Sequence, residues 1–156
     1  MSLQHELGLK TGFRNTEHEA LLSVYYTASL MKKQAAEFFR GQGLTDVQFN
    51  VMMLLVYQST DQEGLNQADL SRMMLVNRAN ITTLIDRMEK AGIVKRTAAP
   101  DDRRSNIIKI TDKGKKLFKK VEPLYIRMVH KTMKSLRPED QNRIIKLLGI
   151  LRQDLY

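Results

Sequence analysis

Apolar side chains recur at helical spacing along most of the chain. Over residues 16–39 they return every three or four positions, which predicts one long amphipathic helix that ends at Gly41. Thr45 and Gln48 then match a capping box, in which each side chain accepts a hydrogen bond from the backbone of the other residue. A second helix should therefore begin here and reach about Tyr57. Its apolar residues lie on nearly all sides, so this helix should be buried.

Two short helices joined by a tight turn follow the polar segment 59–64. Asn66 is placed to cap the first helix and Asn77 the second, because an Asn side chain accepts hydrogen bonds from the free N–H groups at a helix start. The second helix ends at Gly92 and carries one apolar stripe, formed by Ile81, Leu84, Ile85 and Met88. Two short helices of which the second has a polar outer face are typical of a helix-turn-helix.

The next segment predicts a β-hairpin. Residues 93–97 and 107–110 are rich in strand-forming residues and bracket 98–106, which contains turn-forming Pro and Asp residues and many charges. Thr111 can cap a further amphipathic helix, and Pro138 favours the start of a last one.

This order of elements predicts a mainly α fold with a small β-hairpin wing. Residues 45–111 should form a winged helix-turn-helix lobe. The amphipathic helices within 16–41 and 112–156 are too extensive for one such lobe to cover, so we expect them to pair with those of a second copy, most simply in a C2 homodimer. The length of 156 residues suits a single domain, 1–156.

Composition narrows the function classes. There is no Cys, which excludes disulfides, thiolate metal sites and cysteine chemistry. The three His residues are scattered, no phosphate loop or nucleophile motif occurs, and the carboxylate pair Asp101 and Asp102 lies beside two Arg residues that favour its ionised form. We therefore expect no enzyme activity, no metal and no cofactor. No apolar stretch has the length of a signal peptide or a membrane span, so we expect a cytoplasmic protein without membrane contact.

The charge points to a polyanionic partner. The chain carries 26 Lys and Arg residues and 17 Asp and Glu residues, a net charge of +9. Residues 65–120 hold 14 basic and 6 acidic side chains, whereas residues 1–64 hold 5 and 7. The surplus therefore lies over the predicted helix-turn-helix and hairpin, which favours nucleic-acid binding.

Three segments resemble the MarR family of bacterial transcription regulators. Residues 76–94 resemble its recognition helix, residues 102–105 (Asp-Arg-Arg-Ser) followed by 108–114 resemble its D-x-R wing, and residues 43–49 resemble the start of its second helix. The resemblance implies an obligate homodimer that binds double-stranded DNA at a pseudo-palindromic operator, with recognition helices in major grooves and wings at minor grooves. It also implies repression that ends when a small, often aromatic or anionic, molecule binds between the dimer lobe and the reading lobe.

Polar side chains of the predicted recognition helix and wing are the candidates for DNA contact. Asn pairs with adenine, Thr offers a hydroxyl and a methyl group to base edges, and Arg binds guanine or phosphate. Arg104 at the hairpin tip suits a narrow minor groove, and Asp102 would orient it. The predicted contact set is Arg78, Asn80, Thr82, Thr83, Arg87, Lys95, Arg103 and Arg104. Asp86 shares the polar face, and Arg96 and Lys109 are further candidates for phosphate contact.

Other interpretations stay open. Asn80 can simply occupy the first helical turn, Arg87 can pair with Asp86 or Glu89, and the hairpin tip can be an ordinary charged turn. A winged-helix protein-interaction module would have a wing depleted in basic residues, and a non-specific basic nucleic-acid binder would need no base-reading side chains. The basic wing and the neutral Asn and Thr residues favour a sequence-specific regulator.

A site for a small organic or anionic effector is predicted between the first two long helices. Aromatic and Met side chains can line a cleft there, with Arg14 or Lys33 available for an anion. The candidates are His18, Tyr25, Tyr26, Phe49, Met52 and Met53. The alternative is that these side chains belong to the core.

Overall fold

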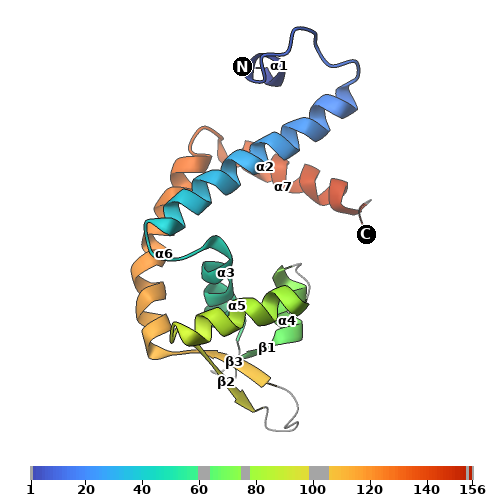
Figure 1. Ribbon diagram of the computed structural model, residues 1–156. Helices are drawn as coiled ribbons and strands as arrows, with labels where there is room; N and C mark the ends of the chain where they lie inside the picture. Colours follow the sequence, from blue (N-terminus) through green and yellow to red (C-terminus); the bar gives the residue numbers. More distant parts are fainter. Residues whose placement is uncertain (1, 60–63, 75–77, 99–105, 154, 156) are drawn as a thin grey trace.

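The structure is a computed structural model that describes residues 2–59, 64–74, 78–98, 106–153 and 155, with the backbone alone at Arg78. In chain order the elements are α1 (Leu3–Glu6), α2 (Thr16–Arg40), α3 (Asp46–Tyr57), β1 (Leu65–Asn66), α4 (Gln67–Met74), α5 (Arg78–Lys90), β2 (Val94–Ala98), β3 (Asn106–Ile110), α6 (Asp112–Met133) and α7 (Pro138–Gln153). Helices α2, α7 and the second half of α6 form an elongated upper part, whereas α3, α4, α5 and the sheet form a compact lower part (Figure 1). The predicted fold class, mainly α with a small antiparallel sheet, is confirmed.

Side-chain caps begin three helices where the sequence predicts them. Gln48 N donates to Thr45 Oγ1 at 3.2 Å and Thr45 N donates to Gln48 Oε1 at 2.9 Å, which completes the capping box of α3. The Asn66 side chain accepts a backbone N–H of α4 at 2.8 Å, and the Thr111 hydroxyl accepts one of α6 at 3.0 Å. The predicted cap Asn77 lies outside the described residues.

The sheet has the strand order β1-β3-β2, and neighbouring strands are antiparallel. β2 and β3 pair from Val94 opposite Ile110 to Ala98 opposite Asn106, which confirms the two predicted strands of the hairpin. β1 pairs with the other side of β3. The sequence does not predict β1, because two residues are too few to form an alternating pattern.

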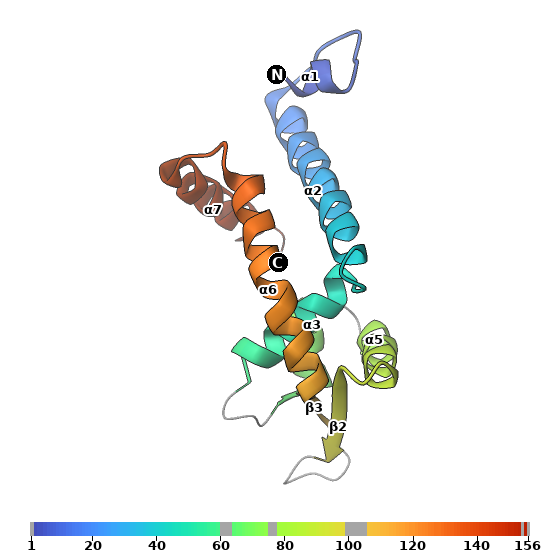
Figure 2. The same ribbon diagram turned by 90° about the vertical axis from the view of Figure 1, so that its left-hand side faces the viewer.

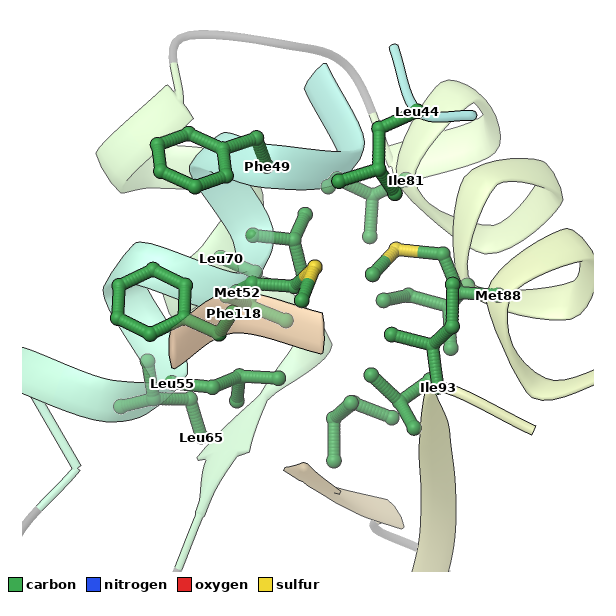
Figure 3. Close-up of a cluster of buried hydrophobic side chains, with 14 of the residues drawn as sticks. Leu44, Phe49, Met52, Leu55, Leu65, Leu70, Ile81, Met88, Ile93 and Phe118 are labelled. Atoms are coloured by element: carbon green, nitrogen blue, oxygen red, sulfur yellow. The ribbon is translucent and has the colours of Figure 1, made fainter. Parts of the chain in front are cut away.

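One hydrophobic core holds the lower part together (Figure 3). Its buried side chains come from the end of α2 and the turn after it, and from α3, α4, α5, the sheet and α6. α5 contributes the predicted stripe: Ile81, Ile85 and Met88 have no exposed surface, and Leu84 packs beside them, partly buried. Burial of this stripe fixes which face of α5 points outward.

The terminal helices are barely covered by this core. In α2 only Phe39 is buried, and no residue of α7, all of which the structure describes, is buried. Large apolar side chains are exposed on α2, α6 and α7: Leu21, Val24, Tyr25, Leu30, Met31, Ile126, Val129, Ile144, Ile145, Leu147, Ile150 and Leu151. Soluble monomers rarely expose apolar surface on this scale. Among the described residues, no helix combines the length and the apolar character needed to cross a membrane.

Candidate nucleic-acid interface

The outer face of α5 is polar and exposed. Asn80, Thr83 and Arg87 are exposed and follow each other at spacings of three and four residues, so they form one row along the helix. Thr82 is also exposed, on the opposite flank of the outward face. Arg78 begins the helix, and its side chain lies outside the described part of the chain. Four of the predicted contact residues therefore lie on the solvent side of a helix anchored by its buried stripe.

Thr83 has part of its hydrogen-bonding capacity in use. Its hydroxyl donates to Ala79 O at 3.1 Å, one helical turn back. The methyl group and the oxygen lone pairs are left for an outside partner, so Thr83 is better suited to a thymine methyl group or a donor than to an acceptor.

Arg96 of β2 connects the hairpin to α5. Its backbone N–H donates to Glu89 Oε1 at 2.8 Å, and its guanidinium donates to Glu89 Oε2 and to Asp86 Oδ1, each at 2.5 Å. The Arg96 side chain is 21% exposed, against 38% and 49% for the two carboxylate partners. Burial lowers the pKa of Arg96, but the hydrogen bonds and charges of the two carboxylates outweigh it and the net shift is upward.

This ion-pair cluster changes two sequence predictions. Arg96 was expected to contact phosphate, and Asp86 to face a groove, but both are engaged with each other. The suggested pairing of Arg87 with Asp86 or Glu89 is replaced by the pairing with Arg96, which comes from a different element. Sequence periodicity could not find this contact, because it joins a helix to a strand.

A second set of contacts joins α5, β2 and the first turn of α6. Lys113 Nζ donates to Ala91 O at 2.7 Å, and the Thr111 hydroxyl donates to Gly92 O at 2.7 Å. Gly114 packs directly on the backbone, since a Cβ there would lie only 2.2 Å from Ile93 O. Two side-chain hydrogen bonds and one close backbone contact therefore hold the turn after α5 against the start of α6.

The wing is described at its base. Lys95 is exposed on β2, where its register partner on β3 is Lys109. The predicted wing residues Asp102, Arg103 and Arg104 lie outside the described residues, between β2 and β3.

The six predicted effector residues do not line a common open pocket in the described structure. Phe49 and Met52 have no exposed surface and belong to the core, which agrees with the alternative stated for them. Ring stacking explains the burial of Phe49, whose ring lies 5.4 Å from that of Phe118. His18 and Tyr25 are exposed on α2, whereas Tyr26 and Met53 are half-buried.

A pocket of about 750 Å³ lies elsewhere, between the end of α3, the sheet and the start of α6. Its lining includes four lysines: Lys95, Lys109, Lys115 and Lys119. The pocket is not predicted from the sequence, because its lysines come from β2, β3 and α6. Among the described residues, no group of His, Asp or Glu side chains is placed to hold a metal ion.

Comparison with known proteins agrees with this architecture. Residues 44–106 match the MarR family model. The chain is 28% identical to the HTH-type transcriptional repressor YetL of Bacillus subtilis (strain 168) over 137 residues, which cover 88% of this chain and 81% of that protein.

Solved structures share the fold. AbsC, a MarR family transcriptional regulator from Streptomyces coelicolor, superposes with a TM-score of 0.84 at 23% identity, covering 94% of this chain and 98% of that one. Sco3205, a MarR family transcriptional regulator from the same organism, solved in complex with DNA, superposes with a TM-score of 0.81 at 22% identity, covering 94% and 92%. In its winged helix-turn-helix fold and in these sequence matches, the chain is similar to the MarR family of transcriptional regulators.

Proposed function

We propose that the chain is a homodimeric repressor that binds a pseudo-palindromic operator in cytoplasmic DNA. Residues 45–111 form the DNA-reading lobe, and residues 16–41 and 112–156 supply the dimerisation helices within the single domain 1–156. Repression is the direction favoured by the similarity to YetL, which is named a repressor.

The exposed row of Asn80, Thr83 and Arg87 carries the proposal. Its helix is held from behind by the core and from the side by Arg96, so the row has a fixed orientation and little entropy is lost when it enters a major groove. Asn80 pairs with adenine, while the two Thr residues of the outward face, Thr82 and Thr83, contact base edges or methyl groups. Arg87 and Arg78 bind guanine or phosphate.

The hairpin acts as a wing at the flanking minor groove. Arg104 enters this groove, whose negative potential attracts a guanidinium group, and Asp102 orients it. Arg103 and Lys95 bind phosphates and add affinity without reading sequence.

The uncovered apolar surface on α2, α6 and α7 supports dimerisation. A second copy of the chain presents the same surface, and packing the two surfaces together buries side chains that a monomer leaves in water. A dimer also places two reading helices on one face of the DNA, as a pseudo-palindromic site requires. An effector that binds between the two parts of the molecule would release the DNA, with His18, Tyr25, Tyr26 and Met53 as the remaining candidates from the sequence.

The decisive experiment is a fluorescence-anisotropy titration of the purified protein against DNA from upstream of its own gene and against a scrambled duplex. The titration is made at two salt concentrations. We expect a preference of at least about a thousandfold for the upstream DNA and a steep loss of affinity with salt, since both phosphate contacts and base contacts contribute.

Two other outcomes would favour other functions. Equal, salt-sensitive binding to both duplexes, and no enrichment of any sequence from random DNA, would identify a non-specific nucleic-acid binder. Absence of binding to any duplex would favour a protein-interaction module.

A further inference from the structure

We infer that the pocket between α3, the sheet and α6 is a binding site for an organic anion that has an apolar body and a sulfonate, carboxylate or phosphate group. It is separate from the site predicted between the first two long helices. Figure 2 views the molecule from the side on which α6 crosses α3 and reaches β3. The anion site itself rests on the geometry of the pocket, whereas its effect on DNA binding rests on the proposed function.

The floor of the pocket is apolar and fixed. Leu55 and Phe118 line it and are 4% and 2% exposed, because both also belong to the hydrophobic core. Val56 and Ile110 extend the apolar surface. Core side chains cannot move aside cheaply, so the pocket is largely formed before a ligand arrives, and its volume of about 750 Å³ lies in the range of small-molecule sites.

The rim of the pocket is basic. Among the described residues that line it are four lysines and two carboxylates, Asp112 and Glu122, so these residues together carry a formal charge of +2. All ion pairs within the described residues use arginine, so none of these lysines is neutralised there by a carboxylate. An anion in the pocket would supply the missing counter-charge.

Two of the lysines are placed against each other by the sheet. Lys95 and Lys109 are register partners on β2 and β3. Like charges directly opposite each other in an antiparallel pair are destabilising, so this arrangement has a cost that a bound anion would remove. Gly64 makes room on the other side of Lys109, since a Cβ there would lie 2.9 Å from Lys109 Cγ and 2.4 Å from Ile108 O.

The neutral polar side chains among the described lining residues each make a hydrogen bond within the protein, and that of Ser59 accepts from Gly64 N at 3.0 Å. The Tyr57 hydroxyl donates to Glu122 across the pocket, and the Thr111 hydroxyl donates to the backbone at Gly92 while accepting from the backbone of α6. The lysine ammonium groups are thus the main groups left for a ligand. A ligand that pairs with them and covers the apolar floor must itself be anionic and partly apolar.

Calorimetric titration without DNA tests the site, with naphthalene-2-sulfonate as the probe and neutral 2-naphthalenemethanol as its matched control. We expect one sulfonate to bind per chain and the neutral compound to bind at least about tenfold more weakly, because only the sulfonate makes charge-assisted hydrogen bonds. In the double variant Lys109→Gln, Lys119→Gln, sulfonate affinity should fall by about tenfold or more. The double variant Lys116→Gln, Lys120→Gln removes the same charge from lysines that do not line the pocket, and it should bind like the wild type.

Equal loss of affinity in both double variants, equal binding of the two compounds, or no binding of the sulfonate by the wild-type protein would overturn the inference. Thermal unfolding gives a second readout. The single variant Lys109→Gln relieves the repulsion from Lys95, so its melting temperature without anion should be higher than that of the wild type. Adding the sulfonate should raise the melting temperature of the variant by less than it raises that of the wild type.

The consequence for DNA binding is tested separately. Lys95 is a proposed phosphate contact, so an anion that pairs with it should weaken binding of the upstream DNA and reduce the dependence of affinity on salt. Sulfonate binding without any specific DNA binding would leave the anion site intact and overturn the proposed function. Specific DNA binding that is unchanged by bound sulfonate would overturn the link between the two.

Discussion

Asn80 is the residue of α5 best suited to identify a base. Its amide offers a donor and an acceptor together, which matches the major-groove edge of adenine. Asn80→Ala should cost about 1–3 kcal/mol of operator binding and relax the preference at one position per half-site. Anisotropy titrations against operators substituted at each position measure both effects. An unchanged order of preference among those operators would remove Asn80 from the base-reading set.

Arg104 belongs to the proposed wing contact. Arg104→Ala should weaken operator binding by about 1–3 kcal/mol, because a guanidinium group is lost from a groove of negative potential. Light scattering should give the same molar mass as for the wild type, since β2 and β3, which flank this segment, lie in the lower part of the molecule, away from α2 and α7 (Figure 1). Wild-type affinity in the variant would exclude a wing contact through this residue.

Tyr57 links the end of α3 to α6 through a hydrogen bond to Glu122. This hydrogen bond, with smaller contributions from burial and from the carboxylate charge, raises the pKa of Tyr57 above its ordinary value. A raised pKa in the folded state means that the contribution to stability is present below the unfolded pKa of about 10 and is lost as the pH rises through the folded pKa. Ultraviolet titration should therefore contain a tyrosinate step above pH ~10 that Tyr57→Phe removes. If the tyrosinate step that Tyr57→Phe removes lay at or below pH ~10, the hydrogen bond between Tyr57 and Glu122 would be contradicted.

Arg96 acts at the scale of elements, because it joins β2 of the hairpin to α5. Arg96→Gln removes the two ion pairs of the guanidinium, leaves the backbone hydrogen bond to Glu89, and should lower the free energy of unfolding by about 1–3 kcal/mol. It should also weaken operator binding, since the angle between α5 and the hairpin is no longer fixed. Chemical denaturation measures the first effect and anisotropy the second. Lys90→Gln, an exposed change on the same helix, should alter unfolding by less than about 0.5 kcal/mol.

Local patterns explain why most elements are predictable from sequence. The capping box of Thr45 and Gln48 and the apolar stripe of α5 depend only on residues within one or two helical turns. Both features can therefore be predicted from the local sequence. β1 is not predictable in this way, because its two residues become a strand only through pairing with β3. The same limit applies to Arg96, whose partners Asp86 and Glu89 lie on another element.

The candidate sites, too, are predictable only where they depend on one element. The exposed face of α5 could be predicted, since burial of one stripe determines the opposite face of a single helix. The basic pocket could not, because Lys95, Lys109 and Lys119 come together only when the hairpin packs beside α6. Phe49 and Met52 were candidates for an effector cleft because aromatic and Met residues suit both ligand sites and cores, and only packing distinguishes the two.

The whole molecule is expected to depend on a second copy. Ile145 of α7 is 65% exposed, so Ile145→Glu should leave a single chain folded but place a carboxylate in the apolar dimer interface. We expect light scattering to give about the 18.0 kDa of one chain instead of twice that value, together with weaker operator binding. The neighbouring change Lys146→Gln should leave the dimer unaltered. A dimer that survives Ile145→Glu would exclude this part of α7 from the interface.

The close contact of Gly114 with Ile93 also bears on which operator lengths the proposed dimer can bind. Gly114 lies so close to Ile93 that a Cβ would meet Ile93 O at 2.2 Å, so the first turn of α6 is packed tightly against the lower part of the molecule, and α6 continues as one helix to Met133. In the proposed dimer, the distance between the two copies of α5 is then set by how the α6 helices are packed, not by a flexible linker. One base pair inserted between half-sites separates them by about 3.4 Å and rotates one relative to the other by about 35°. We expect the proposed dimer to follow that rotation poorly, so operator spacing should be as strict a requirement as operator sequence.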